Sequence, residues 1–418
     1  MPVPEESAPP RALRVVVGVA LAVRVAYWLT KWNRALLLND SWYYSGQALQ
    51  LAHGTWFREL FVDQPGAEHG PLTSILMAPV SYGGHYWNWQ RLVTVATGVA
   101  LVWVIGRMAH EWWGPRVAVV AASIAAVYPN LWMNDGLVMS ESISTLLVAL
   151  SLWAAWRAAH AGPEHVRRSM LLLGAALGLA TLARSELALF VPLVLVWVGL
   201  VRRRSSAPWR PVLVATVVAG LVVAPWVGFN LARFERPVLL TTNDGTTLLG
   251  ANCGDVYHGP NLGGWSLACV TDAQYRQDEE PSVRSARQRS QALHFVRGHL
   301  RSLPRVVVAR VARSLDLYGF TNLVHQDTGE ERPEWAVWAG IVMFWLLAIA
   351  AAFGVRRTGR RLRWLLVLPV VVSLATSVLF YGAHRIRSSA EPVMVLLAAV
   401  GVVSLLDRWA ASRLPQPE

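Results

Sequence analysis

The fold is decided by residues 11–54, RALRVVVGVALAVRVAYWLTKWNRALLLNDSWYYSGQALQLAHG, where a long apolar run is followed by a carboxylate at the start of a short helical segment. A bilayer core of about 30 Å requires about 20 apolar residues of a helix, which this run supplies. Arg11 and Arg14 precede the run as they would in a signal peptide, but the run continues through Leu29. We therefore expect an uncleaved first span. Asp40, just beyond it, either caps the next helix or serves as the base of an enzyme.

Comparable apolar runs recur along the whole chain, which is 54% hydrophobic and only 15% charged and has a mean hydropathy of +0.36. Its 21 tryptophans suit the same class, because Trp concentrates at membrane interfaces. The sequence therefore predicts an all-α polytopic membrane protein with about ten transmembrane helices. The expected spans are 11–30, 87–109, 115–132, 138–158, 169–184, 186–201, 210–229, 335–354, 363–382 and 387–406.

The positive charges indicate how these spans are oriented. The net charge is +12, and most of the excess lies in short loops between the apolar runs, with no basic stripe of the kind that binds nucleic acid. Eighteen Arg residues flank the span ends on one side, against seven cations in the short segments on the other. Because cytoplasmic loops carry the excess of Lys and Arg, both termini are predicted to be cytoplasmic.

Two large segments then face outward, 31–86 and 231–334, and divide the chain into three parts. Residues 1–230 form an N-terminal transmembrane module with the first outer loop, residues 231–334 form the second outer loop, and residues 335–418 form the last spans. Residues 71–82 are too short to span and are expected to be re-entrant or interfacial. The ends 1–10 and 414–418 are expected to be disordered.

The second outer loop contains both cysteines, Cys253 and Cys269. An oxidising compartment favours a disulfide between them, with two free thiols as the alternative. Residues 282–300 have apolar side chains at helical spacing with arginines between them. This helix either lies on the membrane surface or packs on the rest of the loop.

Ionisable and amide side chains gather at the outer span ends. Acids and cations converging at one interface suit a lipid-phosphate substrate, since Arg matches phosphate oxygens and a carboxylate can take the proton of an acceptor hydroxyl. Taken singly, each of them also has a structural explanation, such as a helix cap, an ion pair or a contact with lipid headgroups. They are Asp40, Glu68, His69, Asp135, Glu141, Arg184, Glu186, Asn230, Arg233, His384, Arg385 and Arg387.

An ordered series of segments resembles the C-type superfamily of integral-membrane glycosyltransferases. The branch is that of the protein O-mannosyltransferases and the aminoarabinose transferase of lipid A. The segments are NDSWYYSGQALQLAHG, EHGPLTSILMAP, QRLVTVATG, YPNLWMNDGLVMSESIS, GLATLARSELALFVP, APWVGFNLARFERPVLLTTNDG and HRIRSSAEPVMVLLAAVG.

The resemblance implies the roles of particular residues. Asp40 would be the catalytic base. Ser41 stands where the family often has Glu, which leaves Glu68 and Glu141 as candidates for the second acid. Arg385, Arg387, Arg184 and Arg233 would bind the donor phosphate, and Tyr43, His69, Glu186 and Asn230 would contact substrate.

The function implied is an inverting glycosyltransferase of the bacterial plasma membrane. It would move a sugar from a polyprenyl-phosphate donor to a hydroxyl of a protein, lipid or glycan acceptor on the extracytoplasmic face. Carboxylates suit Mg²⁺ or Mn²⁺, so a divalent metal at Asp40, Glu68 or His69 is an open alternative. A lipid-linked-sugar flippase, a secondary transporter, and a non-catalytic assembly protein of the same fold are the rival functions. The transporter is disfavoured because its ionisable residues would lie near the membrane midplane.

Overall fold

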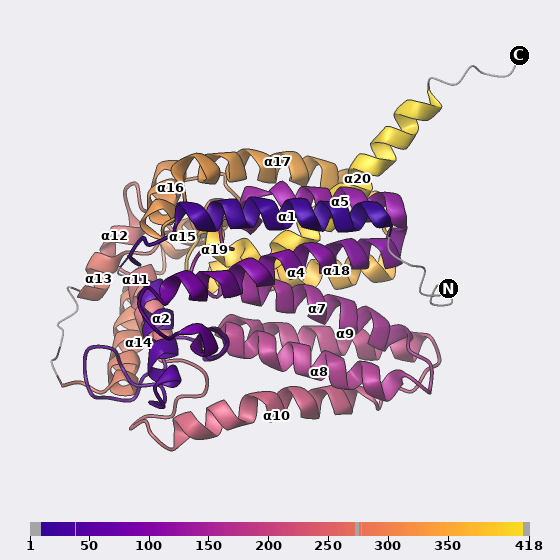
Figure 1. The fold of residues 1–418 in the computed structure, drawn as a ribbon. Coiled ribbons are helices and arrows are strands. Elements are labelled where there is room, and N and C mark those ends of the chain that lie inside the picture. The colour runs from indigo at the N-terminus through magenta and orange to yellow at the C-terminus, as the bar shows by residue number, and fades with distance from the viewer. Residues whose placement is uncertain (1–9, 38, 272–275, 277, 413–418) are drawn as a thin grey trace, which may run out of the picture.

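The computed structural model describes residues 10–412, except 38, 272–275 and 277; the chain ends expected to be disordered lie largely outside these residues. The described part contains α-helices and short 3-10 helices and no strand. Its long helices run side by side as one bundle (Figure 1). The predicted all-α membrane class is therefore confirmed.

Nine helical stretches in the described part of the chain are long and apolar enough to cross a membrane. Most match the expected spans, because the hydropathy that marks a span is also what holds it in lipid. They are α1 (Arg11–Thr30), α4 (Trp87–Trp113), α7 (Glu141–His160), α8 (Val166–Ala183), η2 with α9 (Ser185–Leu189 and Phe190–Arg204), α10 (Val212–Leu231), α17 (Glu334–Arg357), α18 (Arg360–Leu379), and α19, η3 and α20 (His384–Arg387, Ser388–Ala390 and Glu391–Ala411).

The span expected over 115–132 is shorter than predicted. It consists of α5 (Pro115–Val127), followed by the single turn α6 (Pro129–Trp132). Pro129 forces Tyr128 into an extended conformation, because the proline ring disfavours a helical residue before it. At 1.5 Å per residue α5 is about 20 Å long. The described residues thus contain nine helical stretches of spanning length and one shorter apolar helix, against the ten spans expected.

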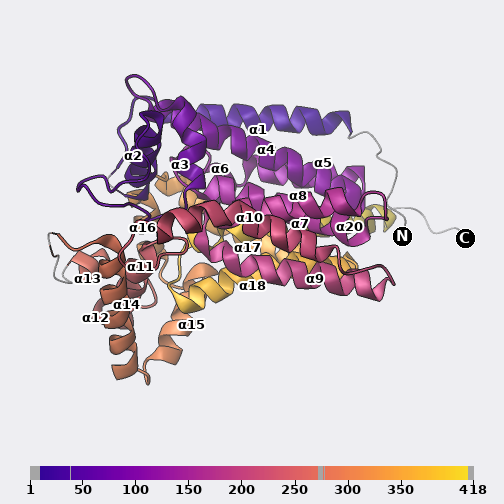
Figure 2. The ribbon, with the colours of Figure 1, turned by 90° about the horizontal axis from the view of Figure 1, so that it is seen from below.

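The elements between the spans gather at one end of the bundle (Figures 1 and 2). The start of α1 and the end of α20 lie toward the opposite end (Figure 1). Residues 71–82 contain two short helices that do not span. The elements at this end are α2 (Asp40–Ala52), α3 (Leu72–Met77), η1 (Ala78–Val80), α11 (Asn243–Ala251), α12 (Gly254–Tyr257), α13 (Leu267–Thr271), α14 (Pro281–Gly298), α15 (Leu303–Ser314) and α16 (Phe320–Gly329).

Helix α14 packs on the rest of the second outer loop, and the face that it buries there contains polar side chains. Its buried side chains include Ser285 and Gln288, which bond to residues of α11, and a Cβ added at Gly245 would lie 2.2 Å from the Ser285 carbonyl oxygen. Leu293, one of the apolar side chains at helical spacing in this segment, is 46% exposed. Polar contacts with α11 therefore decide which face is buried.

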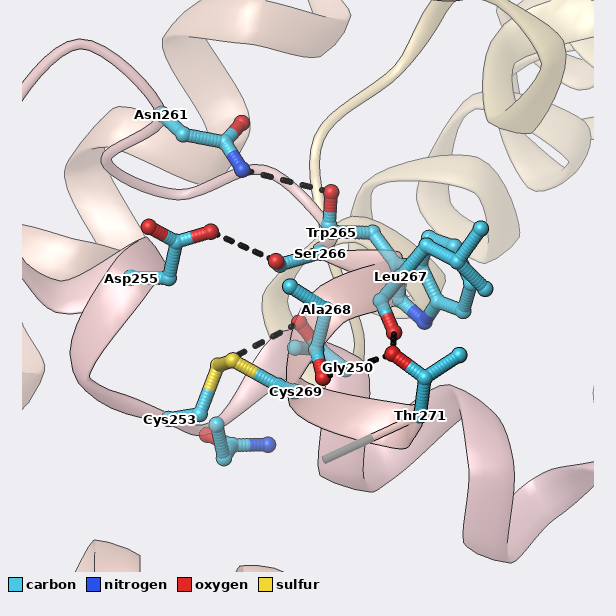
Figure 3. The surroundings of a disulfide bond; sticks show 12 residues. Gly250, Cys253, Asp255, Asn261, Trp265, Ser266, Leu267, Ala268, Cys269 and Thr271 are labelled. Atoms are coloured by element: carbon cyan, nitrogen blue, oxygen red, sulfur yellow. Dashed lines mark hydrogen bonds between the residues drawn. A yellow bond between two sulfur atoms is a disulfide. The ribbon is translucent and has the colours of Figure 1, made fainter. Parts of the chain in front are cut away.

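A disulfide joins Cys253 and Cys269 and ties α12 to α13 (Figure 3). The enclosed segment is braced by the hydroxyl of Ser266, which donates to Asp255 at 2.5 Å. Together these contacts fix the part of the second outer loop that follows α11.

Candidate active site

A pocket of about 410 Å³ opens at the end of the bundle where the elements between the spans gather. Its lining includes charged side chains and the apolar side chains of Leu189, Leu379, Phe380 and Ile386. The pocket thus offers polar and apolar surface to one ligand. Its charged lining comes from four separate parts of the chain: Asp40, Glu68, His69, Arg184, Glu186, Asp244 and Arg385.

Asp40 begins α2 but does not cap it. The cap is Asn39, whose side-chain oxygen accepts from the backbone N–H of Ser41 at 2.8 Å. The Asp40 carboxylate is therefore free to face the pocket. One of its oxygens accepts from Arg385 at 2.6 Å, and the other lies 3.5 Å from Nε2 of His69.

Arg385 contacts three carboxylates at once. Its Nη2 donates to Asp40, its Nε donates to Glu141 at 3.0 Å, and its Nη1 donates to Glu330 at 2.8 Å. These acids come from α2, α7 and the end of α16. All three parts into which the sequence divides the chain therefore meet at this guanidinium.

Arg184 is a second cation in the lining of this pocket. Its Nη1 donates to Glu141 at 3.0 Å, and its Nε donates to Glu186 at 2.5 Å. Glu141 is fully buried, and the oxygen Oε2 of its carboxylate has no hydrogen-bond partner. Arg184 and Arg385 thus share Glu141 and hold two guanidinium groups beside the pocket.

The charges of the pocket shift the pKa of its residues outside the spans. Burial opposes ionisation of Asp40, but Arg385 and His69 outweigh it and hold the pKa of that carboxyl well below its usual range. Burial also opposes the charge of His69, yet Asp40 and Glu68 raise the pKa of the imidazole. Asp40 is accordingly ionised at neutral pH, with the Arg385 guanidinium and the His69 imidazole against its two oxygens.

Behind Arg385 lies a chain of alternating charges that sequence reasoning missed. Glu330 accepts from Arg332, which also donates to Asp327 at 3.2 Å. Asp327 lies 2.5 Å from Nδ1 of His384, whose other ring nitrogen faces Asp316. These acids belong to the second outer loop. Nothing in their sequence positions indicates that they lie beside residues of the span ends.

Two arginines expected to bind phosphate point elsewhere. Arg387 donates to Asp316 at 2.9 Å and to Glu391 at 2.7 Å, away from the pocket. Arg233 donates to the backbone of Phe57 and Gly66 and so fastens the first outer loop.

Three further expected residues also lie outside the pocket lining. Asn230 accepts from Arg233 at 2.9 Å. The Tyr43 hydroxyl accepts from the backbone N–H of Glu68 at 2.9 Å, which positions Glu68 without exposing Tyr43. Asp135 pairs with Arg24 at 2.7 Å inside the bundle. Their contacts hold the fold together.

The residues named for a metal do not assemble a metal centre. Asp40 and His69 lie together, but the described residues contain no group of three His, Cys, Asp or Glu side chains suitably placed for an ion. Asp40 already accepts from Arg385. These described residues therefore do not fit the Mg²⁺ or Mn²⁺ that the sequence left as an open alternative.

Comparisons with known proteins place this geometry in context. The family described as dolichyl-phosphate-mannose-protein mannosyltransferase matches residues 76–229, a little over a third of the chain. No curated protein sequence matches the chain significantly.

Among solved structures, the oligosaccharyltransferase AglB of Archaeoglobus fulgidus, in complex with an inhibitory peptide and a dolichol-phosphate, is similar over 97% of this chain and 52% of its own. The identity is 14% and the TM-score 0.59. ArnT of Cupriavidus metallidurans, bound to undecaprenyl phosphate, aligns over 96% of this chain and 81% of its own, at 18% identity and a TM-score of 0.46. The chain thus spans about half the length of the archaeal enzyme. The partial family match and the fold shared with the archaeal enzyme agree with the resemblance to the C-type glycosyltransferases.

Proposed function

We propose that this chain is an inverting glycosyltransferase that moves a sugar from a polyprenyl-phosphate donor to an acceptor hydroxyl at the extracytoplasmic face. The observation that carries the proposal is Arg385, which bonds to Asp40 in the lining of a pocket that also contains apolar side chains. A lipid phosphate presents both halves of this chemistry, an anion and a hydrocarbon chain. The similarity of the fold to glycosyltransferases supports the same conclusion.

The donor would bind with its phosphate against Arg385 and Arg184. Leu189, Leu379 and Ile386 would receive the first part of the lipid chain. Arg binds phosphate oxygens through its planar fork, so two neighbouring guanidinium groups would hold the phosphate in one orientation. They would also stabilise the charge that develops as the phosphate leaves, typically a large part of catalysis.

Arg385 would also control the base. In the free protein its bond to Asp40 keeps the pKa of that carboxyl low. When Arg385 turns to the donor phosphate, Asp40 loses a cationic partner and its pKa rises, which makes it a stronger base. The carboxylate would then take the proton of the acceptor hydroxyl. The hydroxyl oxygen bonds to the anomeric carbon, and the carbon–oxygen bond to phosphate breaks with its electron pair on the phosphate.

Transfer from radiolabelled polyprenyl-phospho-sugars in membranes that contain the full chain would test this mechanism. We expect Asp40→Asn to lower transfer by about 10²-fold or more, as for loss of a general base. Asp63→Asn is the matched control, because Asp63 lies on the same loop with a side chain that is 92% exposed.

The control should transfer sugar at the wild-type rate. Undiminished transfer by Asp40→Asn would remove Asp40 from its role. Failure of the wild type with every polyprenyl-phosphate donor would count against the enzyme itself and in favour of a transporter or assembly protein.

A further inference from the structure

A second pocket, of about 480 Å³, lies at the same end of the bundle between the end of α1 and the start of α17. Segment 330–332 separates it from the candidate active site. Glu330 bonds to Arg385 on one side, while Glu331 bonds to Arg91 on the other. The pocket is lined by Lys31 and Arg34 together with the rings of Tyr27 and Trp335.

Lys31 is the only lysine of the chain and is 93% buried, with a relative exposure of 7%. Its ammonium donates to the carbonyl oxygen of Glu331 and lies 5.5 Å from the centre of the Tyr27 ring. No carboxylate of the described residues lies within ion-pair distance of it. Burial lowers its pKa to about 8, partly opposed by Glu331. A buried cation without an anionic partner is costly, so this position favours an anion.

The acids that line this pocket do not fill that need. Glu331 uses one carboxylate oxygen to accept from Arg91 at 2.9 Å and the other to accept from the backbone of Leu37 at 3.1 Å. Glu334 is exposed at the first turn of α17. Arg34 is exposed and forms no ion pair among the described residues. Lys31 and Arg34 are therefore the cations left for a ligand.

We propose that this pocket binds the phosphate of an anionic phospholipid from the leaflet that meets this end of the bundle. The pocket lies where α1 ends and α17 begins, which is the depth of the lipid headgroups for two spans. Leu37 and Trp335 at its rim are 47% and 66% exposed, so acyl chains have apolar surface beside the cations. This site is separate from the donor pocket and does not depend on glycosyl transfer.

Native mass spectrometry of the full chain in detergent tests this site, with dioleoyl phosphatidylglycerol as the probe and dioleoyl phosphatidylcholine as the neutral comparison. Each cation near a membrane surface contributes about 1 kcal/mol, which is about fivefold in affinity. We expect Lys31→Gln and Arg34→Gln each to weaken phosphatidylglycerol binding about fivefold, and the double variant to weaken it by the product. Arg58→Gln is the control, because Arg58 is a half-exposed cation of the first outer loop that pairs with Asp63 and does not line this pocket.

Selective loss of phosphatidylglycerol binding in the Lys31 and Arg34 variants supports the site. Equal binding by wild type and the Arg34→Gln variant overturns it, and so does an equal loss in Arg58→Gln. If Lys31→Gln fails to fold, Arg34→Gln decides alone, since Arg34 is on the surface. Displacement of the lipid by inorganic phosphate would overturn the lipid assignment in favour of a free anion.

Discussion

Arg385 is the central residue of the candidate site, because its guanidinium donates hydrogen bonds to three carboxylates. Arg385→Gln would leave these acids without their shared cation, and breaking a buried pair costs about 3–5 kcal/mol of stability. Arg385→Lys keeps the charge but loses the fork. We expect the Lys variant to stay folded in thermal unfolding while transfer falls about 10²-fold. The control is Arg116→Lys, which alters an exposed ion pair with Asp407. Wild-type transfer by Arg385→Lys would contradict phosphate binding by this fork.

His69 gives the site a pH dependence whose direction follows from Asp40. Asp40 raises the pKa of His69 in the folded protein above its ordinary value of 6.5. The stability from protonated His69 is therefore complete below its unfolded pKa and is lost as pH rises through the folded pKa. Thermal unfolding from about pH 6 to about pH 9 should show this loss in the wild type. His69→Gln should lack that part of the slope; an identical slope in both proteins would contradict the pairing.

The sequence could place a side chain at one end of the bundle where a span end fixes its position, but not where its direction depends on local geometry. Asp40, Glu141, Arg184 and Arg385 all follow or precede spans, so cation bias alone placed them at one end. The sequence did not predict that Arg387 turns away from Arg385, which follows because it lies two residues later on α19 and residues at that spacing do not share a helix face. The supporting acids of the second outer loop left no periodic signal.

Among the elements, α17 and α20 make the closest approach, through two glycines. A Cβ at Gly401 would lie 1.9 Å from the Ala350 carbonyl oxygen, and one at Gly354 would lie 1.9 Å from that of Leu397. We expect Gly401→Val to destabilise the protein in detergent by about 1–3 kcal/mol or more, since overpacking separates the helices. Gly220→Val is matched to it, because a Cβ at Gly220 meets nothing within 4 Å. Equal unfolding of the two variants would show that this approach is unimportant.

We expect the disulfide of the second outer loop to contribute to the stability of the protein but not to sugar transfer. Cys253 and Cys269 are 16 residues apart, and closing a loop of that size contributes about 3 kcal/mol. Replacing both by Ser should lower the unfolding temperature of the loop. Neither cysteine lines the candidate active site, so transfer at a permissive temperature should persist. A loss of transfer without a loss of stability would place this segment in the site.

For the whole molecule, hydropathy sufficed to predict the bundle, because each span must carry its own apolar surface. It misplaced the end of α5, where a single proline outweighs the hydropathy of the residues after it. Hydropathy also says nothing of how α11 to α16 fold over one end of the bundle. Those contacts join residues far apart in sequence, such as Arg385 and Glu330, and depend on packing.

Transfer at the extracytoplasmic face requires that the pocket end of the bundle faces outward. Single introduced cysteines can test this orientation. The described cysteines are paired with each other, so an added thiol would be the reactive one in unreduced protein. Asp63, with a 92% exposed side chain, lies on the first outer loop, while exposed Ser206 lies in the turn between α9 and α10 at the other end of the bundle. Because cations gather at the Ser206 end, a membrane-impermeant maleimide should label Asp63→Cys on intact cells and Ser206→Cys only after permeabilisation. The reverse pattern would place the pocket in the cytoplasm and exclude an extracytoplasmic acceptor.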